Sequence, residues 1–172
     1  AEDLAPVRPA QTWVGNLVLP DDARLGLRDV EIKIRSFSSN EEIAGLAEEL
    51  RIGGQQGLRQ AMFRLEQKAW VRIGRSAATS VGVVRYAKLP AGSHRLRVVS
   101  DQPARLLDKS DPAGSPDHPF AYIELVVPAE GLGQGRMIAA ASLAFTEEGL
   151  SIASAGAPVI EIADVRFETP SP

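Results

Sequence analysis

The amino-acid sequence predicts an α+β fold that is mainly β, an antiparallel β-sandwich or flattened barrel with one αα-hairpin packed on it. Three observations favour this class. Apolar and charged residues alternate throughout the segment 30–35, VEIKIR, as they do in a strand with one buried face. Short strand-like segments separated by turn residues fill the chain from residue 69 onward. Apolar residues at helical spacing occur at about 39–66.

Length and composition are those of a single globular domain. The chain has 172 residues, of which 44% are apolar and 24% are charged. We expect the domain to span 12–168, between a flexible tail at 1–11 and a disordered end at 169–172. No apolar run approaches the roughly eighteen residues that a transmembrane helix requires. The absence of Cys excludes disulfides, thiolate metal sites and a Cys nucleophile.

The first part of the chain is predicted to form two strands and then two helices. A strand near 12–19 precedes the one at 30–35. Ser39 and Glu42 have the spacing of a capping box, which marks a helix start, and Gly53-Gly54 ends this helix. Each helix has one apolar stripe to pack against the sheet, formed by Ile43, Leu46, Ala47 and Leu50 in the first and by Leu58, Ala61, Met62 and Leu65 in the second.

Turn residues divide the rest of the chain into eight predicted strands. They are placed near 69–74, 80–88, 94–100, 103–108, 119–127, 135–146, 149–155 and 158–168. The clearest pair encloses Gly131-x-Gly133-x-Gly135. Because Gly tolerates positive φ, we predict that these three glycines form the turn of a long hairpin. The longest irregular loop is 109–119.

Charge is unevenly distributed along the chain, although the net charge is only −3. Residues 64–109 contain ten Lys and Arg against three Asp and Glu, whereas residues 110–172 contain two against nine. Such a distribution can mark a surface that binds anions. It is equally expected where basic strands pair with acidic strands across a sheet. Both explanations stay open at this point.

The two histidines are the first candidates for catalysis, because His is the commonest general base. His118 follows Asp117 in the long loop, so a hydrolase that uses Asp117 and His118 is one alternative. Neighbours in sequence rarely form a catalytic triad, however, and this pair also suits the cap of a loop. His94, at the start of a predicted strand, is interpreted as a surface residue.

The sequence predicts no metal ion and no cofactor. Acidic residues in the long loop lack the Gly and the Glu that complete a calcium-binding loop. Gly131-x-Gly133-x-Gly135 is followed by a strand, whereas a phosphate-binding loop leads into a helix. No spacing among Glu124, Glu161 and Asp164 indicates the paired carboxylates of a glycosidase.

Basic and aromatic residues of the middle strands are the strongest candidates for ligand or anion binding. They are Trp70, Arg72, Arg85, Arg95 and Arg97. The spacing of two residues places Trp70 with Arg72 on one strand face, and Arg95 with Arg97 on another. Arg beside an aromatic ring suits phosphate and other anions. A pI near 5.5 and an aromatic content of 5% argue against nucleic acid as the partner.

A run of small residues suggests a carrier of small apolar ligands as a second alternative. The run consists of Ala139, Ala140, Ala141, Ser142 and Ala144. Small side chains could leave a pocket between the sheet and the helices. They also allow close contact with the helical hairpin, which leaves no pocket.

Several motifs are shared with a known kind of protein. They are Gly53-Gly54-Gln55, the segment 98–103, Asp117-His118-Pro119-Phe120, Ile123-Glu124-Leu125 and the Gly133-x-Gly135 turn before the segment 138–141. Together, over most of 27–168, they resemble a family of uncharacterised exported bacterial proteins that carry a domain of unknown function. The resemblance implies export and names no catalytic residue.

The first residues bear on localisation and so on function. The chain begins Ala1-Glu2-Asp3 without an initiator Met, which fits either signal-peptide cleavage or a trimmed recombinant chain. With the resemblance, this favours a mature periplasmic or extracellular protein. We therefore expect a non-catalytic exported bacterial domain that binds a protein partner or a small-molecule ligand.

Overall fold

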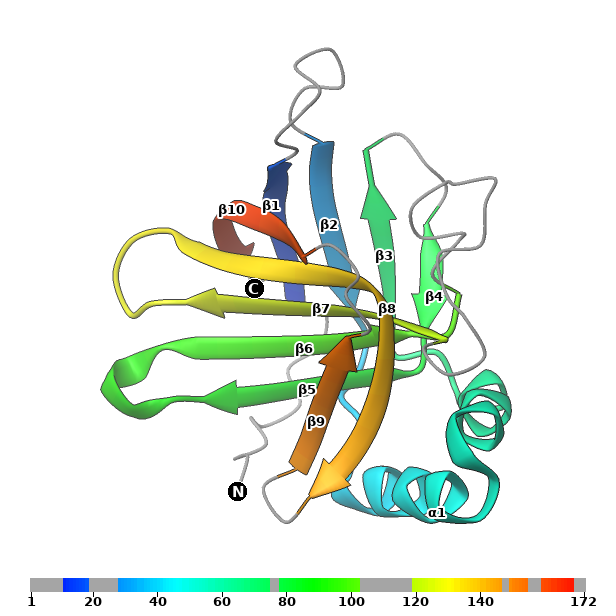
Figure 1. Ribbon diagram of the computed structural model, residues 1–172. Helices are drawn as coiled ribbons and strands as arrows, with labels where there is room; N and C mark the ends of the chain where they lie inside the picture. The colour runs from blue at the N-terminus through cyan, green and yellow to red at the C-terminus, as the bar shows by residue number, and fades with distance from the viewer. Residues whose placement is uncertain are drawn as a thin grey trace.

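In the computed structural model, the described residues form ten β-strands in one antiparallel sheet, which curls over itself (Figure 1). The structure describes residues 11–18, 28–74, 78–102, 119–146, 149–154 and 159–168. Its elements are β1 (Gln11–Val18), β2 (Arg28–Ile34), α1 (Asn40–Phe63), β3 (Ala69–Ile73), β4 (Thr79–Val81), β5 (Val83–Lys88), the 3₁₀ turn η1 (Pro90–Gly92), β6 (His94–Ser100), β7 (Phe120–Val127), β8 (Gly133–Thr146), β9 (Gly149–Ser154) and β10 (Val159–Glu168). The strand order is β4-β3-β2-β1-β10-β8-β7-β6-β5, and β9 pairs with β8 outside this path.

This architecture confirms the prediction of a mainly β, antiparallel fold with helical cover. The sequence left a sandwich and a flattened barrel open, and the structure has one sheet curled into a half-barrel. The two ends of the strand order, β4 and β5, are separated in the chain by Gly82 alone, so both edges of the sheet start from one corner. The single strand predicted near 80–88 is therefore two strands.

Several predicted features lie outside the described residues. They are the tail at 1–10, the strand near 103–108, the long loop with Asp117 and His118, and the C-terminal residues 169–172. Gln11, assigned to the tail by the sequence, instead opens β1 and is paired with Ile34 of β2. Within the described residues, no helix is long and apolar enough to cross a membrane.

The inner face of the curled sheet surrounds the larger of two hydrophobic cores. Strands from both halves of the curl contribute to it, with Trp13 and Ile32 on one side and Leu96 and Ile123 on the other, all 1% exposed or less. Alternation explains the arrangement, because β1 buries every second side chain along its whole length. Removal of these apolar side chains from water is the main favourable contribution to folding.

The second hydrophobic core lies on the outer face of the sheet. Here α1 and the β8–β9 hairpin cover β5, β6 and β7, and Leu58 of α1 packs with Val83, Val99 and Phe120. Strands β5 to β7 thus bury apolar side chains on both faces, although their outer face also carries Arg85, Arg97 and Glu124. Both predicted helix stripes contact this core, through Leu46, Leu58 and Met62, which are buried, and Ile43, Leu50, Ala61 and Leu65, which are partly buried.

The helical region α1 is broken at Gly54, where the sequence predicted the first helix to end, and its two parts lie at an angle to each other (Figure 1). The predicted αα-hairpin is thus confirmed only as two helical parts divided at this position. Gly54 has φ 66° and ψ −161°, a conformation open to glycine that bends α1 sharply. Gln55 holds the bend against the sheet. Its Nε2 donates to the Leu143 carbonyl (2.8 Å), and its Oε1 accepts from the Leu143 N–H (2.9 Å). The predicted capping box of Ser39 and Glu42 is confirmed, with both of its hydrogen bonds present.

The glycines of the β7–β8 hairpin have two different roles, which corrects the prediction that all three form its turn. Gly131, with φ 91°, lies in the turn. Gly133 and Gly135 belong to β8, where a β-carbon would lie 2.1 Å from the Val126 carbonyl oxygen and 2.3 Å from that of Glu124. Close approach of the β7 backbone therefore requires glycine at both positions.

Candidate functional site

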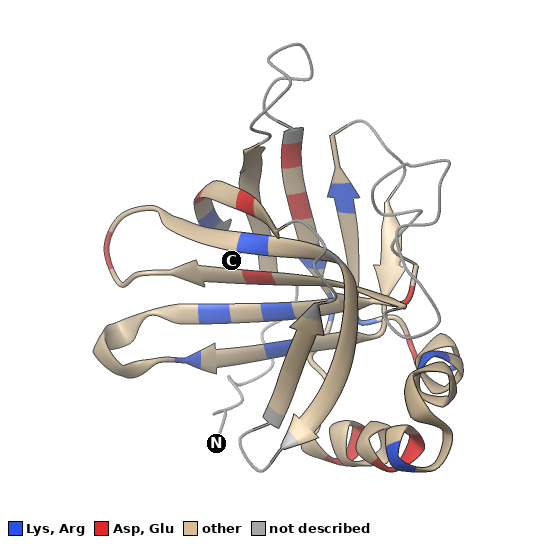
Figure 2. Ribbon diagram, in the orientation of Figure 1, with Lys and Arg blue, Asp and Glu red and all other residues tan. Residues whose placement is uncertain are grey.

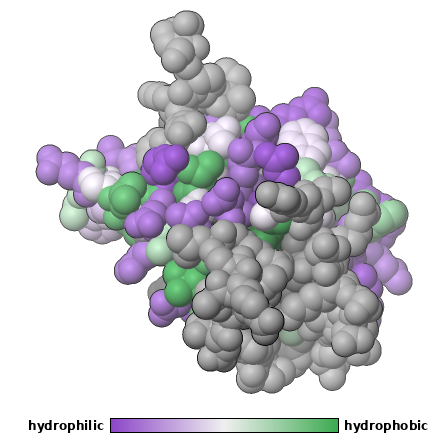
Figure 3. All heavy atoms as spheres, turned by 90° about the horizontal axis from the view of Figure 1, so that it is seen from above, coloured by the Kyte–Doolittle hydropathy of each residue, from purple (hydrophilic) through white to green (hydrophobic). Residues whose placement is uncertain are grey.

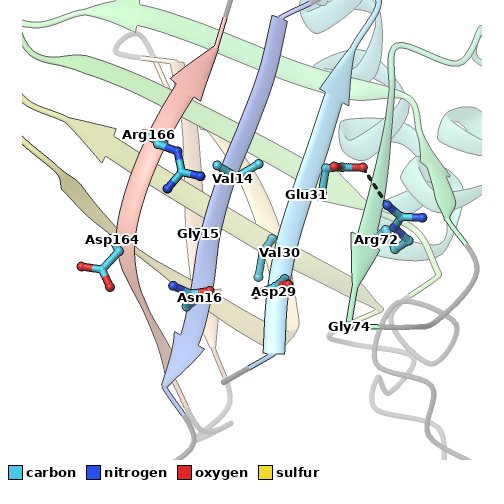
Figure 4. A pocket seen from close by; sticks show the side chains of 10 residues that line it. All are labelled: Val14, Gly15, Asn16, Asp29, Val30, Glu31, Arg72, Gly74, Asp164 and Arg166. Atoms are coloured by element: carbon cyan, nitrogen blue, oxygen red, sulfur yellow. Dashed lines mark hydrogen bonds and ion pairs between the residues drawn. The ribbon is translucent and has the colours of Figure 1, made fainter. Parts of the chain in front are cut away.

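The outer face of β10, β1, β2 and β3 is covered by neither α1 nor β9, and it contains a polar groove (Figure 4). The hollow has a volume of about 250 Å³ and is lined by Val14, Gly15, Asn16, Asp29, Val30, Glu31, Arg72, Gly74, Asp164 and Arg166. We call it the Asp164 groove. Its polar side chains alternate along each strand with the apolar side chains of the inner core. Strand order alone brings these residues together from both ends of the chain.

The strand register arranges the groove in two rows. The first row consists of Arg166, Val14, Glu31 and Arg72, which are cross-strand neighbours on β10, β1, β2 and β3. The second contains Asn16 and Asp29, which are paired on β1 and β2, with Ala163 of β10 opposite Asn16. Asp164, next to Ala163, and Gly74 border the groove beside this row. Adjacent strands lie about 4.8 Å apart, so the first row extends about 14 Å across the sheet. A ligand on this face therefore meets basic groups at the ends of one row and acidic groups in the other.

A β-bulge in β10 places Asp164 in the groove. The register of β10 slips against both of its neighbours, between Ile162 and Val165 toward β8 and opposite Val14 and Asn16 of β1. Asp164 has φ 54°, a left-handed conformation that Asp tolerates better than most residues. Ile162 and Val165 consequently both face the inner core, while Asp164 is exposed on the outer face.

Hydrogen bonds and ion pairs within the groove leave part of its charge available. Arg72 Nη2 lies 3.1 Å from Glu31 Oε1, which cancels one charge of each sign. The Asn16 amide, in the orientation that satisfies its neighbours, donates to Asp29 Oδ1 (2.9 Å) and to the Gly15 carbonyl (3.3 Å). Asp164 forms no ion pair with any described residue. The second row is therefore a source of negative charge.

No family model, curated protein or solved structure matches this chain. Function has to be inferred from what the groove can do chemically. Its described lining offers carboxylates, guanidinium groups and one amide, and no His, Ser or Thr is among these described residues. Among the described residues, no group of three or more His, Asp and Glu side chains is placed to hold a metal ion. The groove is thus equipped to bind a polar group.

The structure divides the predicted anion-binding residues between two regions. Arg72 lines the Asp164 groove, and Trp70 lies two residues away on the same face of β3, opposite Lys33 of β2. Arg85, Arg95 and Arg97 lie on β5 and β6, at the other end of the strand order, where Figure 2 shows basic residues gathered. Anion binding by these five residues remains a prediction.

Arg85 and Arg97 are buried and hold covering segments onto the sheet. Arg85 donates to the Ser38 carbonyl (2.7 Å) and to Asn40 Oδ1 (2.8 Å), which fixes the start of α1. Arg97 donates to the Leu150 carbonyl of β9 (2.7 Å). Arg85 and Arg97 are each 6% exposed, so these hydrogen bonds take the place of hydrogen bonds to water.

The uneven charge along the chain is explained in part by pairing across the sheet. Arg97 of β6 stands opposite Glu124 of β7, which stands opposite Arg136 of β8 and, beyond it, Glu161 of β10. Arg136 Nε lies 3.0 Å from Glu124 Oε2. Basic and acidic segments thus alternate from strand to strand along this row.

Neither alternative function finds support among the described residues. Asp117 and His118 lie outside them, so the hydrolase stays a prediction. His94 lies far from the groove in strand order and forms a short hydrogen bond with the Tyr86 hydroxyl. Burial and the nearby Lys88 lower its pKa. Buried side chains of the outer core fill the contact between α1 and the sheet, while a hollow of about 710 Å³ lies beside the second half of α1, at Arg59, Phe63 and Asp101. The carrier therefore also stays a prediction.

The small residues of β8 do not line a common space. Ala141 belongs to the outer core, Ala144 is exposed and Ala140 and Ser142 are half-buried, while the side chain of Ala139 lies outside the described set. Gln55 of α1 bonds to the backbone of Leu143 within this stretch, and close packing of the small residues themselves on the helices stays a prediction.

Sequence reasoning missed Asn16, Asp29, Asp164 and Arg166 as parts of one site. One signal was available. The buried positions of β10 are spaced by three residues, from Ile162 to Val165, where an unbroken strand spaces them by two. Such a slip in alternation indicates a bulge, and bulges are common beside functional sites. No comparable signal could place β1 beside β10.

Proposed function

We propose that this protein is a non-catalytic exported bacterial domain that binds a polar partner through the Asp164 groove. The observation that carries the proposal is the bulge at Asp164. It turns an acidic side chain outward in a strained backbone conformation, at the β10 edge of a groove lined by charged groups from four strands.

The rigidity of the scaffold supports a binding role. The groove lies on regular strands whose inner face is packed in the larger core, so its polar groups are held in fixed positions. Binding sites on such elements lose little conformational entropy when a partner docks. Export, which the motifs of the sequence imply, gives the domain access to partners outside the cytoplasm.

Photo-cross-linking in cells of the source organism tests the proposal. A photoreactive amino acid in place of Val14, which lines the groove, should give a defined adduct, while the same residue in place of Glu49 on the exposed side of α1 should not. The proposal is wrong if position 14 gives no adduct, or if both positions give the same products. Cell fractionation of the unmodified protein should find it in the periplasm or the medium.

A further inference from the structure

A second hollow adjoins the Asp164 groove on the outer face. It has a volume of about 720 Å³, and its lining includes Glu124, Arg136, Leu132, Val159, Glu161 and Asp164. Asp164 borders both hollows, so the two lie next to each other at β10. Together they cross β3, β2, β1, β10, β8 and β7 in strand order. At about 4.8 Å per strand this path is about 24 Å long, the length of about seven extended residues.

The second hollow differs from the first in exposing apolar side chains. Leu132 is 57% exposed and Val159 is 51% exposed, although both are large hydrophobic residues. They border the same hollow from the β7–β8 turn and from the start of β10. Seen from above, hydrophobic surface lies among hydrophilic surface on the side where the β7–β8 hairpin projects (Figure 3). Exposed apolar side chains rimmed by charged ones are typical of protein-binding surfaces.

The charge that remains available along this path is negative. Arg136 is paired with Glu124 and Arg72 with Glu31, and Arg166 is engaged as well. Glu161 and Asp164 form no ion pair within the described part of the chain. Both are exposed, and both line the second hollow. Charge complementarity therefore calls for a partner that brings cations to β10.

We propose that the partner is an extended polypeptide segment in which Lys or Arg stands beside an apolar residue. Its cation lies against Glu161 and Asp164, and its apolar side chain packs on Leu132 and Val159. This inference rests on the proposed function and specifies the chemistry of the partner. A polypeptide fits better than a free polyamine, because a polyamine has no branched apolar side chain to cover Leu132.

Fluorescence anisotropy with labelled nonapeptides tests this chemistry. Lys-Leu-Gly repeated three times should bind saturably. Lys-Ser-Gly repeats should bind about fivefold more weakly because they leave Leu132 exposed, and Glu-Leu-Gly repeats should not bind. The double substitution Glu161→Gln/Asp164→Asn should weaken Lys-Leu-Gly binding about tenfold. The matched control Glu48→Gln/Glu49→Gln removes the same charge from the exposed side of α1 and should leave affinity unchanged.

Three outcomes overturn the inference. They are absence of saturable Lys-Leu-Gly binding, equal binding of the Glu-Leu-Gly peptide, and full competition by spermidine at equal charge, which would show that cationic charge alone is recognised. The proposed function fails separately, when the photoreactive residue at position 14 gives no adduct. An adduct at position 14 together with failed peptide binding would reject the polypeptide chemistry and leave the groove as a binding site.

Discussion

Charged residues occupy the outer face of the sheet in two regions, and the regions use them differently. On β5 and β6, under α1 and β9, Arg85 and Arg97 are buried and donate to backbone and side-chain oxygens of the segments that cover them. On β10, β1, β2 and β3, Arg72 and Asp164 are exposed and border an open groove. The comparison shows that alternation determines which face of the sheet a charged side chain lies on. Whether that side chain is buried and structural or exposed and available for binding depends on the element packed over the face.

The largest expected effect on stability is at Gly135, where β8 pairs with β7. Gly135→Ala would place a β-carbon 2.3 Å from the Glu124 carbonyl oxygen, so β8 and β7 must separate. We expect a loss of about 3 kcal/mol in the free energy of unfolding. Gly45→Ala is the matched control, since nothing lies within 4 Å of its added β-carbon in the middle of α1, and it should stabilise by about 0.5–1 kcal/mol. Urea denaturation of both variants measures the difference.

Substitution of one arginine in each region compares their contributions to stability directly. Arg97→Met removes a charged hydrogen bond to a buried carbonyl and should cost about 2 kcal/mol. Arg72→Met breaks an exposed ion pair with Glu31 and should cost less than about 1 kcal/mol. Equal losses in chemical denaturation would show that the covered and open regions do not differ as described.

A partly buried ion pair near the covered region makes stability depend on pH. Lys68 is 4% exposed, and its Nζ lies 3.0 Å from Glu42 Oε2. Burial acts to raise the pKa of Glu42, but hydrogen bonds from Lys68 and Ser39 outweigh it and hold that pKa below its ordinary 4.5. The stabilisation is therefore complete above about pH 4.5 and is lost as the pH falls through the lower folded-state value.

Glu42→Gln tests this link directly. It keeps a side chain able to bond at the helix start but removes the counter-charge of Lys68, so we expect a loss of about 1–2 kcal/mol at pH 7. The difference between wild type and variant should shrink when unfolding is measured below pH 4. A stability difference between wild type and variant that stays constant across this pH range would show that the ion pair of Glu42 and Lys68 is not its source.

His94 is expected to have the smallest effect. Burial and Lys88 lower its pKa, so the neutral ring is favoured in the folded protein and the unfolded chain binds the proton more readily. Stability should be complete above the unfolded value of about 6.5 and fall as the pH drops toward the folded-state value. Because the ring is partly exposed, the loss between pH 7.5 and 5.5 should be less than about 0.5 kcal/mol. His94→Gln should abolish this part of the pH dependence.

The sequence predicted local features of the fold better than it predicted the outer face. Alternation at 30–35 predicted β2, and capping-box spacing predicted the start of α1, because both depend on residues close in the chain. The spacing of Gly133 and Gly135 could not distinguish a turn from a close backbone approach. In the same way, Arg97 looked available for a ligand because its partner, Leu150, lies 53 residues away.

The candidate site depends on strand order, which the sequence did not contain in readable form. Trp70 and Arg72 were placed on one face by their spacing, and that placement is confirmed by the register of β3 with β2. Asn16 and Asp164 line the same groove only because β1 pairs with β10, although these strands lie near opposite ends of the chain. The extra residue between Ile162 and Val165 indicated a bulge, but not which strand lay beside it.

Mapping of amide chemical shifts in a ¹⁵N–¹H NMR titration with the Lys-Leu-Gly nonapeptide tests the central comparison most directly. The open region should respond, with saturable shifts at Asn16, Asp29, Leu132, Glu161 and Asp164. The covered region should not, so the amides of Arg85, Arg97 and Leu150 should keep their positions. Shifts centred on β5 and β6, or no saturable shifts in the open region, would contradict the difference in role between the covered and the open region.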